Sequence, residues 1–257
     1  METVQTFKVE KLQVQVYQSK SALADAAAAW VSALLDEAIR EKGRANLILA
    51  TGASQFELVE SLKKKAIEWK RITVFHLDEY KGMSITHPAS FRKYLKERIL
   101  DEVQPAQVHL LNGDSPDVEA ELKRYESLLA ASEIDCACIG IGENGHIAFN
   151  DPAVADFHDP RLVKVVDLDE ACRRQQLGEG WFPTLADVPT QALSLTIPAI
   201  MRCRAISCVV PDQRKAAAVR AALYGPIETA CPASILRTHA HAKLFLDSHS
   251  SSLIQFP

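Results

Sequence analysis

Short apolar runs alternate along the chain with longer stretches in which apolar residues recur at helical spacing. The runs have the length and composition of strands buried on both faces, and they lie at 46–50, 72–77, 134–141 and 205–210. The stretches with helical spacing lie at 21–41, 56–69, 90–103, 118–131 and 216–223. This alternation predicts an α/β fold with three layers, in which a Rossmann-like, mostly parallel sheet is flanked by helices.

The periodicity is lost over residues 153–189. This segment is polar and proline-bounded at its start, and later it mixes charges, glycines and the bulky pair Trp181-Phe182. Mobile covers need few buried contacts, so a segment of this kind is a candidate lid. Strand patterns also occur at 11–17, which alternates like an edge strand, and at 192–197 and 242–246. No tract separates two units, so we expect a single domain over residues 1–257.

Composition and charge exclude several classes of binding partner and cellular location. The net charge of −4 is spread without a basic stripe, which argues against nucleic acid. No run approaches the roughly 20 apolar residues of a membrane span, and the first residues hold no apolar core of a secretory signal. The six cysteines lie mostly in apolar runs and are expected to be reduced, in a cytoplasmic protein. We expect no metal and no cofactor, and the sequence leaves a homo-oligomer open.

A glycine-rich loop follows the apolar run 134–141. Ligands of parallel sheets bind beyond the carboxyl ends of the strands, and glycines at 140, 142 and 145 let backbone N–H groups approach a substrate closely. His146 can exchange protons near neutral pH, and the carboxylate of Asp151 can orient its ring. The loop predicts a proton-transfer site; the alternative is a structural turn with a surface histidine.

The same loop resembles a known family. Residues 142–152 read Gly-Glu-Asn-Gly-His-Ile-Ala-Phe-Asn-Asp-Pro, which is similar to the signature of the glucosamine-6-phosphate deaminase (isomerase) family, in the superfamily that includes 6-phosphogluconolactonases. Lactonases usually continue after the histidine with Thr-Ala-Ser-Leu-Phe-Pro, so the continuation here is that of the deaminases. The resemblance implies that the histidine opens the sugar ring and is held by two carboxylates. Asp151 matches one of them, and Asn144 replaces the other.

Two further segments are candidates for binding phosphate. Thr51-Gly52-Ala53-Ser54 lies between a strand and a helix, where unpaired amides and the helix dipole favour an anion, although small residues also suit a plain turn. Lys215 opens a helix, where its charge opposes the dipole and suggests a nearby anion; the alternative is a solvated lysine. Both segments resemble phosphate-binding blocks of the family. The lid arginine of the family has no clear match, and Arg173 and Arg174 are the candidates.

Two adjacent acids, Asp78 and Glu79, follow the run 72–77. Acids at a strand end are costly to bury without a task or a partner, and alternation in extended chain turns only one of them toward a site. The block Asp-Glu-Tyr resembles that of the family, whose first acid is the general base, so the resemblance assigns this role to Asp78. Glu79 then lies beside the substrate and orients or packs locally. The alternative for both acids is a solvated strand end.

Three functions remain open at this point. A hexosamine-6-phosphate deaminase/isomerase fits Asp78 and the segment after His146 together. A 6-phosphogluconolactonase needs only the histidine and the phosphate site, and the residues after His146 argue against it. A non-catalytic sugar-phosphate sensor normally carries an N-terminal helix-turn-helix, and no such pattern precedes Lys11. The deaminase is favoured, with a small-molecule sugar phosphate as its partner and with the epimer of the sugar open.

Overall fold

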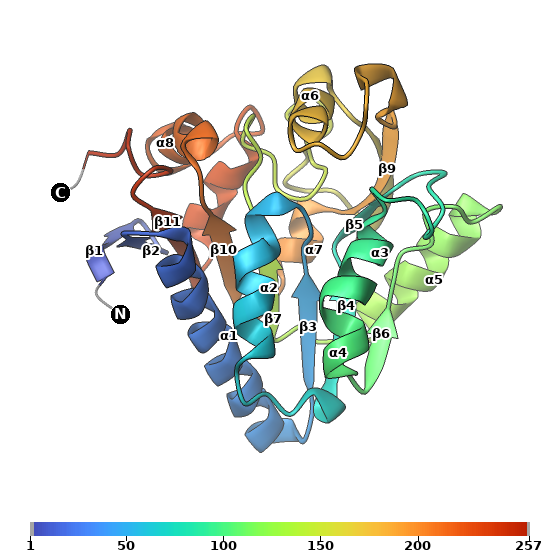
Figure 1. The fold of residues 1–257 in the computed structure, drawn as a ribbon, viewed down its shortest axis with the longest axis horizontal. Helices are drawn as coiled ribbons and strands as arrows, with labels where there is room; N and C mark the ends of the chain where they lie inside the picture. The colour runs from blue at the N-terminus through green and yellow to red at the C-terminus, as the bar shows by residue number, and fades with distance from the viewer. Residues whose placement is uncertain (1–2, 256–257) are drawn as a thin grey trace.

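An eight-stranded sheet forms the centre of the computed structural model, which describes residues 3–255 (Figure 1). In sheet order the strands are β1 (Thr3–Val9), β2 (Leu12–Tyr17), β11 (Ala242–Asp247), β10 (Ile206–Val210), β7 (Cys136–Ile139), β3 (Ala45–Leu49), β4 (Ile72–His76) and β6 (Gln107–His109). Only the β1–β2 pair in this sheet is antiparallel. All residues of β7 and β10 are buried, as their continuous apolar runs predict.

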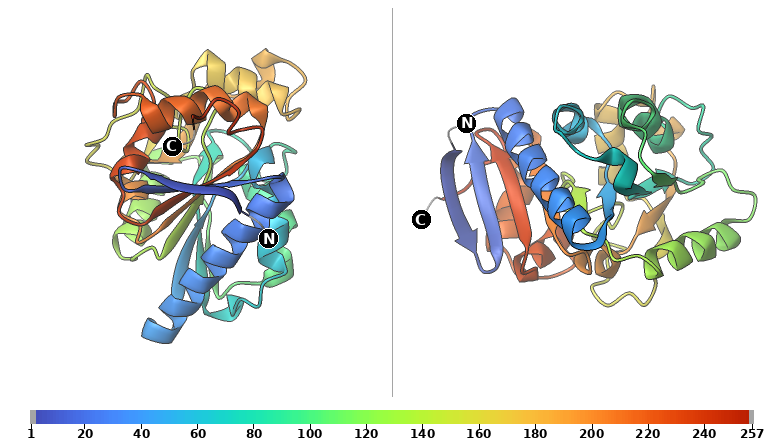
Figure 2. Two further views of the ribbon diagram at one scale, coloured as in Figure 1. Left: turned by 90° about the vertical axis from the view of Figure 1, so that its left-hand side faces the viewer. Right: turned by 90° about the horizontal axis from the view of Figure 1, so that it is seen from below.

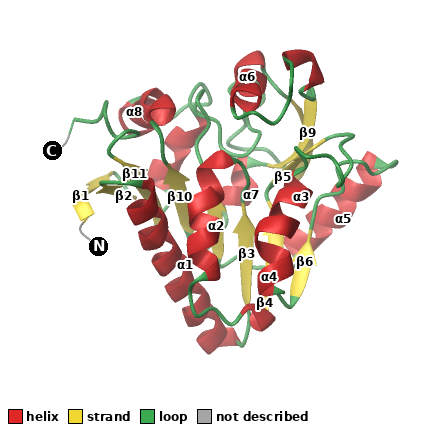
Figure 3. Cartoon of the chain, viewed as in Figure 1, coloured by secondary structure: helices red, strands yellow, loops and turns green. Residues whose placement is uncertain are grey.

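Helices cover both faces of the sheet, as the views in Figures 1 and 2 and the cartoon in Figure 3 show. One face packs against α1 (Lys20–Lys42), α2 (Phe56–Lys63), α3 (Phe91–Leu95) and α4 (Asp101–Val103). The other face packs against α5 (Val118–Ala130), α7 (Ile197–Met201) and α8 (Ala216–Tyr224). The predicted three-layer α/β fold with a mostly parallel sheet is confirmed.

A second, smaller sheet lies above the carboxyl ends of the central strands (Figure 1). It is antiparallel, and its strands in order are β5 (Asp78–Tyr80), β9 (Gln191–Leu195) and β8 (Val163–Asp167). The chain passes from β4 to β5 with one residue between them, so β5 joins the two sheets. Asp78, at the start of β5, therefore lies just beyond the carboxyl end of β4.

The segment 153–189, in which the sequence shows no periodicity, contains regular structure. The segment contains β8, which pairs with β9, and helix α6 (Glu170–Gly178), whose N-cap Asp169 accepts a hydrogen bond from the backbone N–H of Cys172. The helix escaped the sequence pattern because it is short and mostly polar. Its buried residues include two glutamines rather than an apolar stripe.

Three sequence expectations differ in detail from the structure. The predicted helix 56–69 ends as α2 at Lys63, and the predicted helix 90–103 is interrupted by a π-helical turn over Lys96–Leu100. Strand β1 was not predicted. None of the helices within residues 3–255 is long and apolar enough to cross a membrane. Met1 and Glu2, on which the expectation about a secretory signal partly rests, lie outside the described residues.

Candidate active site

Four loops meet at the carboxyl edge of the central sheet. They follow β3, β4, β7 and β10, which are neighbours in the sheet and run parallel, so the strand ends lie side by side. The loops line a cavity that is partly open to solvent. Its lining includes Thr51, Gly52 and Ser54 after β3, Asp78 after β4, His146 after β7, and Lys215 after β10. Residues predicted from separate segments of the sequence therefore share one cavity.

The carboxylate of Asp78 lies in this cavity and is almost wholly buried. Burial, together with the nearby charge of Glu79, raises the pKa of Asp78 from its ordinary value of 3.8 to about 8. A carboxyl group with such a pKa can both accept and release a proton near neutral pH. This is the property that a general acid–base group needs.

Glu79 points away from the cavity, as the alternation of side chains along a strand predicts. Its carboxylate accepts hydrogen bonds from the backbone N–H groups of Tyr80, Phe91 and Arg92 at 2.9, 3.1 and 2.9 Å. It also accepts from the Ser90 hydroxyl at 2.8 Å and from Arg92 Nε at 3.2 Å. Burial raises the pKa of Glu79, while these hydrogen bonds lower it. Glu79 thus ties β5 to α3 and does not line the cavity.

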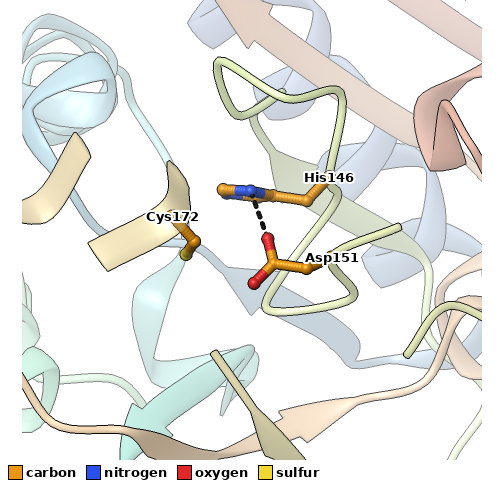
Figure 4. A group of neighbouring side chains, drawn as sticks. All are labelled: His146, Asp151 and Cys172. Carbon is orange, nitrogen blue, oxygen red and sulfur yellow. Dashed lines mark ion pairs between the residues drawn. The ribbon is translucent and has the colours of Figure 1, made fainter. Parts of the chain in front are cut away.

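The ring of His146 is held by two acceptors on its Nδ1 atom, and Figure 4 shows one of them, Asp151. Asn144 Oδ1 lies 2.7 Å from Nδ1 and Asp151 Oδ1 lies 2.9 Å from it. Because both neighbours accept, we assign the proton of the neutral ring to Nδ1, which leaves the lone pair on Nε2. Asn144 Nδ2 also donates to Asp151 Oδ1 at 3.0 Å. Asn144 and Asp151 therefore orient the imidazole from outside the cavity lining.

Hydrogen-bond donors surround the buried carboxylate of Asp151. Burial raises the pKa of Asp151, but hydrogen bonds from His146, Asn144 and the Asp169 backbone N–H outweigh burial and lower it. Asp169 also accepts from Asn144 Nδ2 at 3.0 Å. The N-cap of α6 is thereby connected to the residues that orient His146, a role that the sequence analysis missed.

The side chain of Cys172 lies beside His146 and Asp151 (Figure 4). His146, Asp151 and Cys172 each offer one potential metal ligand, and these atoms lie within 4.8 Å of one another. Burial and the negative charges of Asp151 and Asp169 raise the pKa of the Cys172 thiol. In the protein alone, this environment favours the protonated form of the Cys172 thiol.

Two glycines allow the His146 loop to fold as it does. A Cβ atom on Gly142 would lie 2.1 Å from His146 Cε1, so the imidazole packs directly on the Gly142 backbone. Gly145 has a φ of 86°, and a Cβ there would lie 2.9 Å from Cys231 Sγ. Gly145 is not part of the cavity lining, so the structure gives it a conformational role and places its backbone outside the cavity.

The loop after β3 offers groups that bind anions. Its residues Ala53–Gln55 form a 3₁₀ turn that leads directly into α2, so the loop lies at a helix N-terminus. Thr51 Oγ1 is buried and has no hydrogen-bond partner within residues 3–255. Ser54 Oγ accepts from Gln55 Nε2, which leaves its own proton free to be donated. Ala53 does not line the cavity. Its backbone N–H donates a hydrogen bond to the side chain of Glu179, which does line the cavity.

Lys215 follows β10 and lies at the end of a 3₁₀ turn that leads into α8. The side chain lines the cavity and is almost wholly buried, and burial lowers the pKa of its ammonium group. A nearby anionic ligand would raise that pKa again. Lys215 and the loop 51–54 thus line the same cavity.

Helix α6 and the residue after it contribute three cavity residues that the sequence analysis missed, namely Gln175, Gln176 and Glu179. The spacing of Gln175 and Glu179, four residues apart, places them on one helix face and was the available signal. The two candidate lid arginines do not line the cavity. Arg173 donates to the carbonyl groups of Leu185 and Val188, and the exposed Arg174 pairs with Glu170.

Comparison with known sequences identifies the family. A sequence model described as glucosamine-6-phosphate isomerases/6-phosphogluconolactonase matches residues 18–246. The chain belongs to this family. It is 34% identical over 220 residues to the glucosamine-6-phosphate deaminases of Bacillus thuringiensis (strain Al Hakam) and Bacillus anthracis (strain A0248), with 86% of this chain and 82% of each relative covered.

Solved structures agree with this assignment. A monomeric glucosamine-6-phosphate deaminase superposes with a TM-score of 0.86 at 32% identity, over 94% of this chain and 99% of that one. The 6-phosphogluconolactonase of Shewanella baltica OS155 superposes with a TM-score of 0.76 at 19% identity, over 94% of this chain and 100% of that one. At that identity the second likeness shows the fold alone. The family resemblance of residues 142–152 is confirmed.

The raised pKa of Asp78 makes the stability of the protein depend on pH. Between the unfolded-state value near 4 and the folded-state value of about 8, only the unfolded chain ionises, so the wild type loses about 1.4 kcal/mol per pH unit at this residue. The variant Asp78→Asn has no carboxyl group at this position and so does not lose stability in this way. We expect urea unfolding to show that the free energy of unfolding of the variant, minus that of wild type, rises by about 3 kcal/mol from pH 5 to pH 7.5. The same substitution at the exposed Asp101 should show no such rise, and a pH-independent difference for Asp78→Asn would contradict the assignment.

The contact between Gly142 and the imidazole predicts the effect of a single methyl group. Gly142→Ala should force the ring of His146 off Asn144 and Asp151 or shift the backbone, at a cost of about 1–3 kcal/mol in the free energy of unfolding. Gly178→Ala is the matched control, because a Cβ there meets Arg214 only at an ordinary 3.7 Å. Chemical denaturation measures both variants. Equal stability of the two variants would show that the ring does not pack as described.

Proposed function

We infer that the protein is an enzyme that converts a hexosamine 6-phosphate to a ketose 6-phosphate and ammonia. The observation that supports this most directly is that Asp78 and His146 line the same cavity as the loop 51–54 and Lys215. The 34% identity to deaminases over most of the chain points to the same reaction. Overall, the amino sugar phosphate and one water become the ketose phosphate and ammonia, without a cofactor.

The phosphate of the substrate would bind at the end of the cavity formed by residues 51–54 and Lys215. Backbone N–H groups at the helix N-terminus, the hydroxyl groups of Thr51 and Ser54, and the ammonium group of Lys215 are all suited to an anion. Binding the phosphate here fixes the distal carbon of the sugar. It thereby holds the ring carbons near Asp78 and His146.

His146 would open the sugar ring. Its Nε2 accepts the proton of the anomeric hydroxyl, the bond between C1 and the ring oxygen breaks, and the ring oxygen takes up a proton. The imidazole is positively charged while it holds the transferred proton. The carboxylate of Asp151, 2.9 Å from Nδ1, stabilises that charge, while the amide of Asn144 only accepts a hydrogen bond.

Asp78 would move the proton of the open-chain sugar. Its carboxylate removes the proton from C2 and returns it to C1, while the protonated amino group gives up one proton and the aldehyde oxygen gains one to become a hydroxyl. The amino aldehyde thereby becomes an imine at C2, and water then replaces the nitrogen and releases ammonia. The protonated amino group at C2 would lie close to Asp78. This positive charge lowers the pKa of Asp78 and favours the ionised base. An amino sugar thus suits a carboxyl group whose pKa is about 8 in the protein alone.

Activity assays test the assignment. We expect ammonia release from glucosamine 6-phosphate or galactosamine 6-phosphate to exceed hydrolysis of 6-phosphogluconolactone. Asp78→Asn should abolish deamination while substrate binding, measured by calorimetry, is largely kept, because the amide fills the same space but cannot take the C2 proton. Asp101→Asn, at an exposed position, is the control and should retain full activity. Dominant lactone hydrolysis, or an active Asp78→Asn variant, would overturn the proposed function.

A further inference from the structure

Glu179, the residue that follows α6, places its carboxylate against the loop 51–54. The backbone N–H of Ala53 donates a hydrogen bond to Glu179 Oε2 at 3.4 Å. The same oxygen lies 3.7 Å from where a Cβ on Gly52 would be. A carboxylate oxygen thus lies beside the first amides of the turn that leads into α2, at the position where the helix dipole favours an anion.

Two side chains hold this carboxylate in place. Gln175 Nε2 donates to Oε1 at 3.0 Å, and Trp181 Nε1 donates to Oε2 at 3.3 Å. The ring of Trp181 in turn packs edge-on against the ring of Phe56, the first residue of α2, with 6.3 Å between centroids. The position of Glu179 is therefore fixed both by α6 and by the helix whose N-terminus it approaches.

The carboxylate of Glu179 also interacts electrostatically with the ammonium group of Lys215. Glu179 and Lys215 both line the cavity, and the charge of Glu179 raises the pKa of Lys215, against the stronger lowering by burial. Glu179 therefore interacts with both groups to which the substrate's phosphate is assigned, the amides of the loop and the ammonium group. A phosphate bound there would lie next to a second anion unless Glu179 withdraws.

We propose that Glu179 competes with the phosphate of the substrate for the loop 51–54 and Lys215, and so determines how tightly the enzyme binds phosphorylated sugars. The proposal rests on the phosphate position in the proposed function. Binding of a phosphorylated sugar displaces the carboxylate, together with the end of α6, from the Ala53 amide. Sugars without phosphate leave this contact intact.

Calorimetric titration of the whole protein with inorganic phosphate at pH 8 tests the competition. Glu179→Gln keeps the size of the side chain and removes its charge, so we expect its Kd for phosphate to fall at least tenfold, because a like charge a few ångströms away is lost. Glucosamine without phosphate should bind wild type and variant equally. Glu170→Gln is the matched control, since Glu170 is exposed on the same helix and pairs with Arg174; its phosphate Kd should equal that of wild type.

An unchanged or higher phosphate Kd in Glu179→Gln would overturn the proposal, as would an equal gain for glucosamine, because Glu179 would then act on the sugar. Glu179→Ala provides the same comparison if the glutamine variant does not fold. Inorganic phosphate is bound and not turned over, so the titration is independent of catalysis. A protein that deaminates no amino sugar, but whose Glu179→Gln variant binds phosphate more tightly, would refute the proposed function and leave the competition intact.

Discussion

The parallel order of β10, β7, β3 and β4 is the constraint on which the site depends. Because these four strands are neighbours and run in one direction, the loops that follow them leave the sheet at the same edge. Each loop brings one kind of group: an ammonium after β10, an imidazole after β7, amides and hydroxyls after β3, and a carboxylate after β4. The small sheet then holds Asp78 in place, because Glu79 ties β5 to α3 from the opposite side of the strand.

Burial shifts the pKa values of Asp78 and Lys215, which both line the cavity, in opposite directions. It raises the pKa of Asp78 and lowers that of Lys215, so both side chains are shifted toward their neutral forms. A ligand with a cation near Asp78 and an anion near Lys215 restores both charges. An amino sugar phosphate carries this pair of charges on one molecule. The electrostatics of the cavity and the chemistry of the proposed substrate therefore support each other.

Much of this site could be predicted because its residues follow apolar runs at the ends of buried strands. The alternation along extended chain also separates Asp78 from Glu79, although it does not show that Glu79 binds Ser90 and Arg92. Residues 170–179 were not predictable in the same way, since a short polar helix has no apolar stripe and its partners are distant. Glu179 contacts Ala53, which is 126 positions away in the chain, and neither segment alone indicates this contact.

In the proposed reaction, one bound sugar spans the cavity from Lys215 to Asp78. A crystal structure with 2-amino-2-deoxyglucitol 6-phosphate, an open-chain analogue without the carbonyl group that isomerisation needs, would show whether a ligand binds in this way. We expect the phosphate on residues 51–54 and Lys215, the amino-bearing carbon within hydrogen-bond reach of Asp78, and C1 toward His146. An analogue bound in the reverse direction, or outside the cavity, would contradict it.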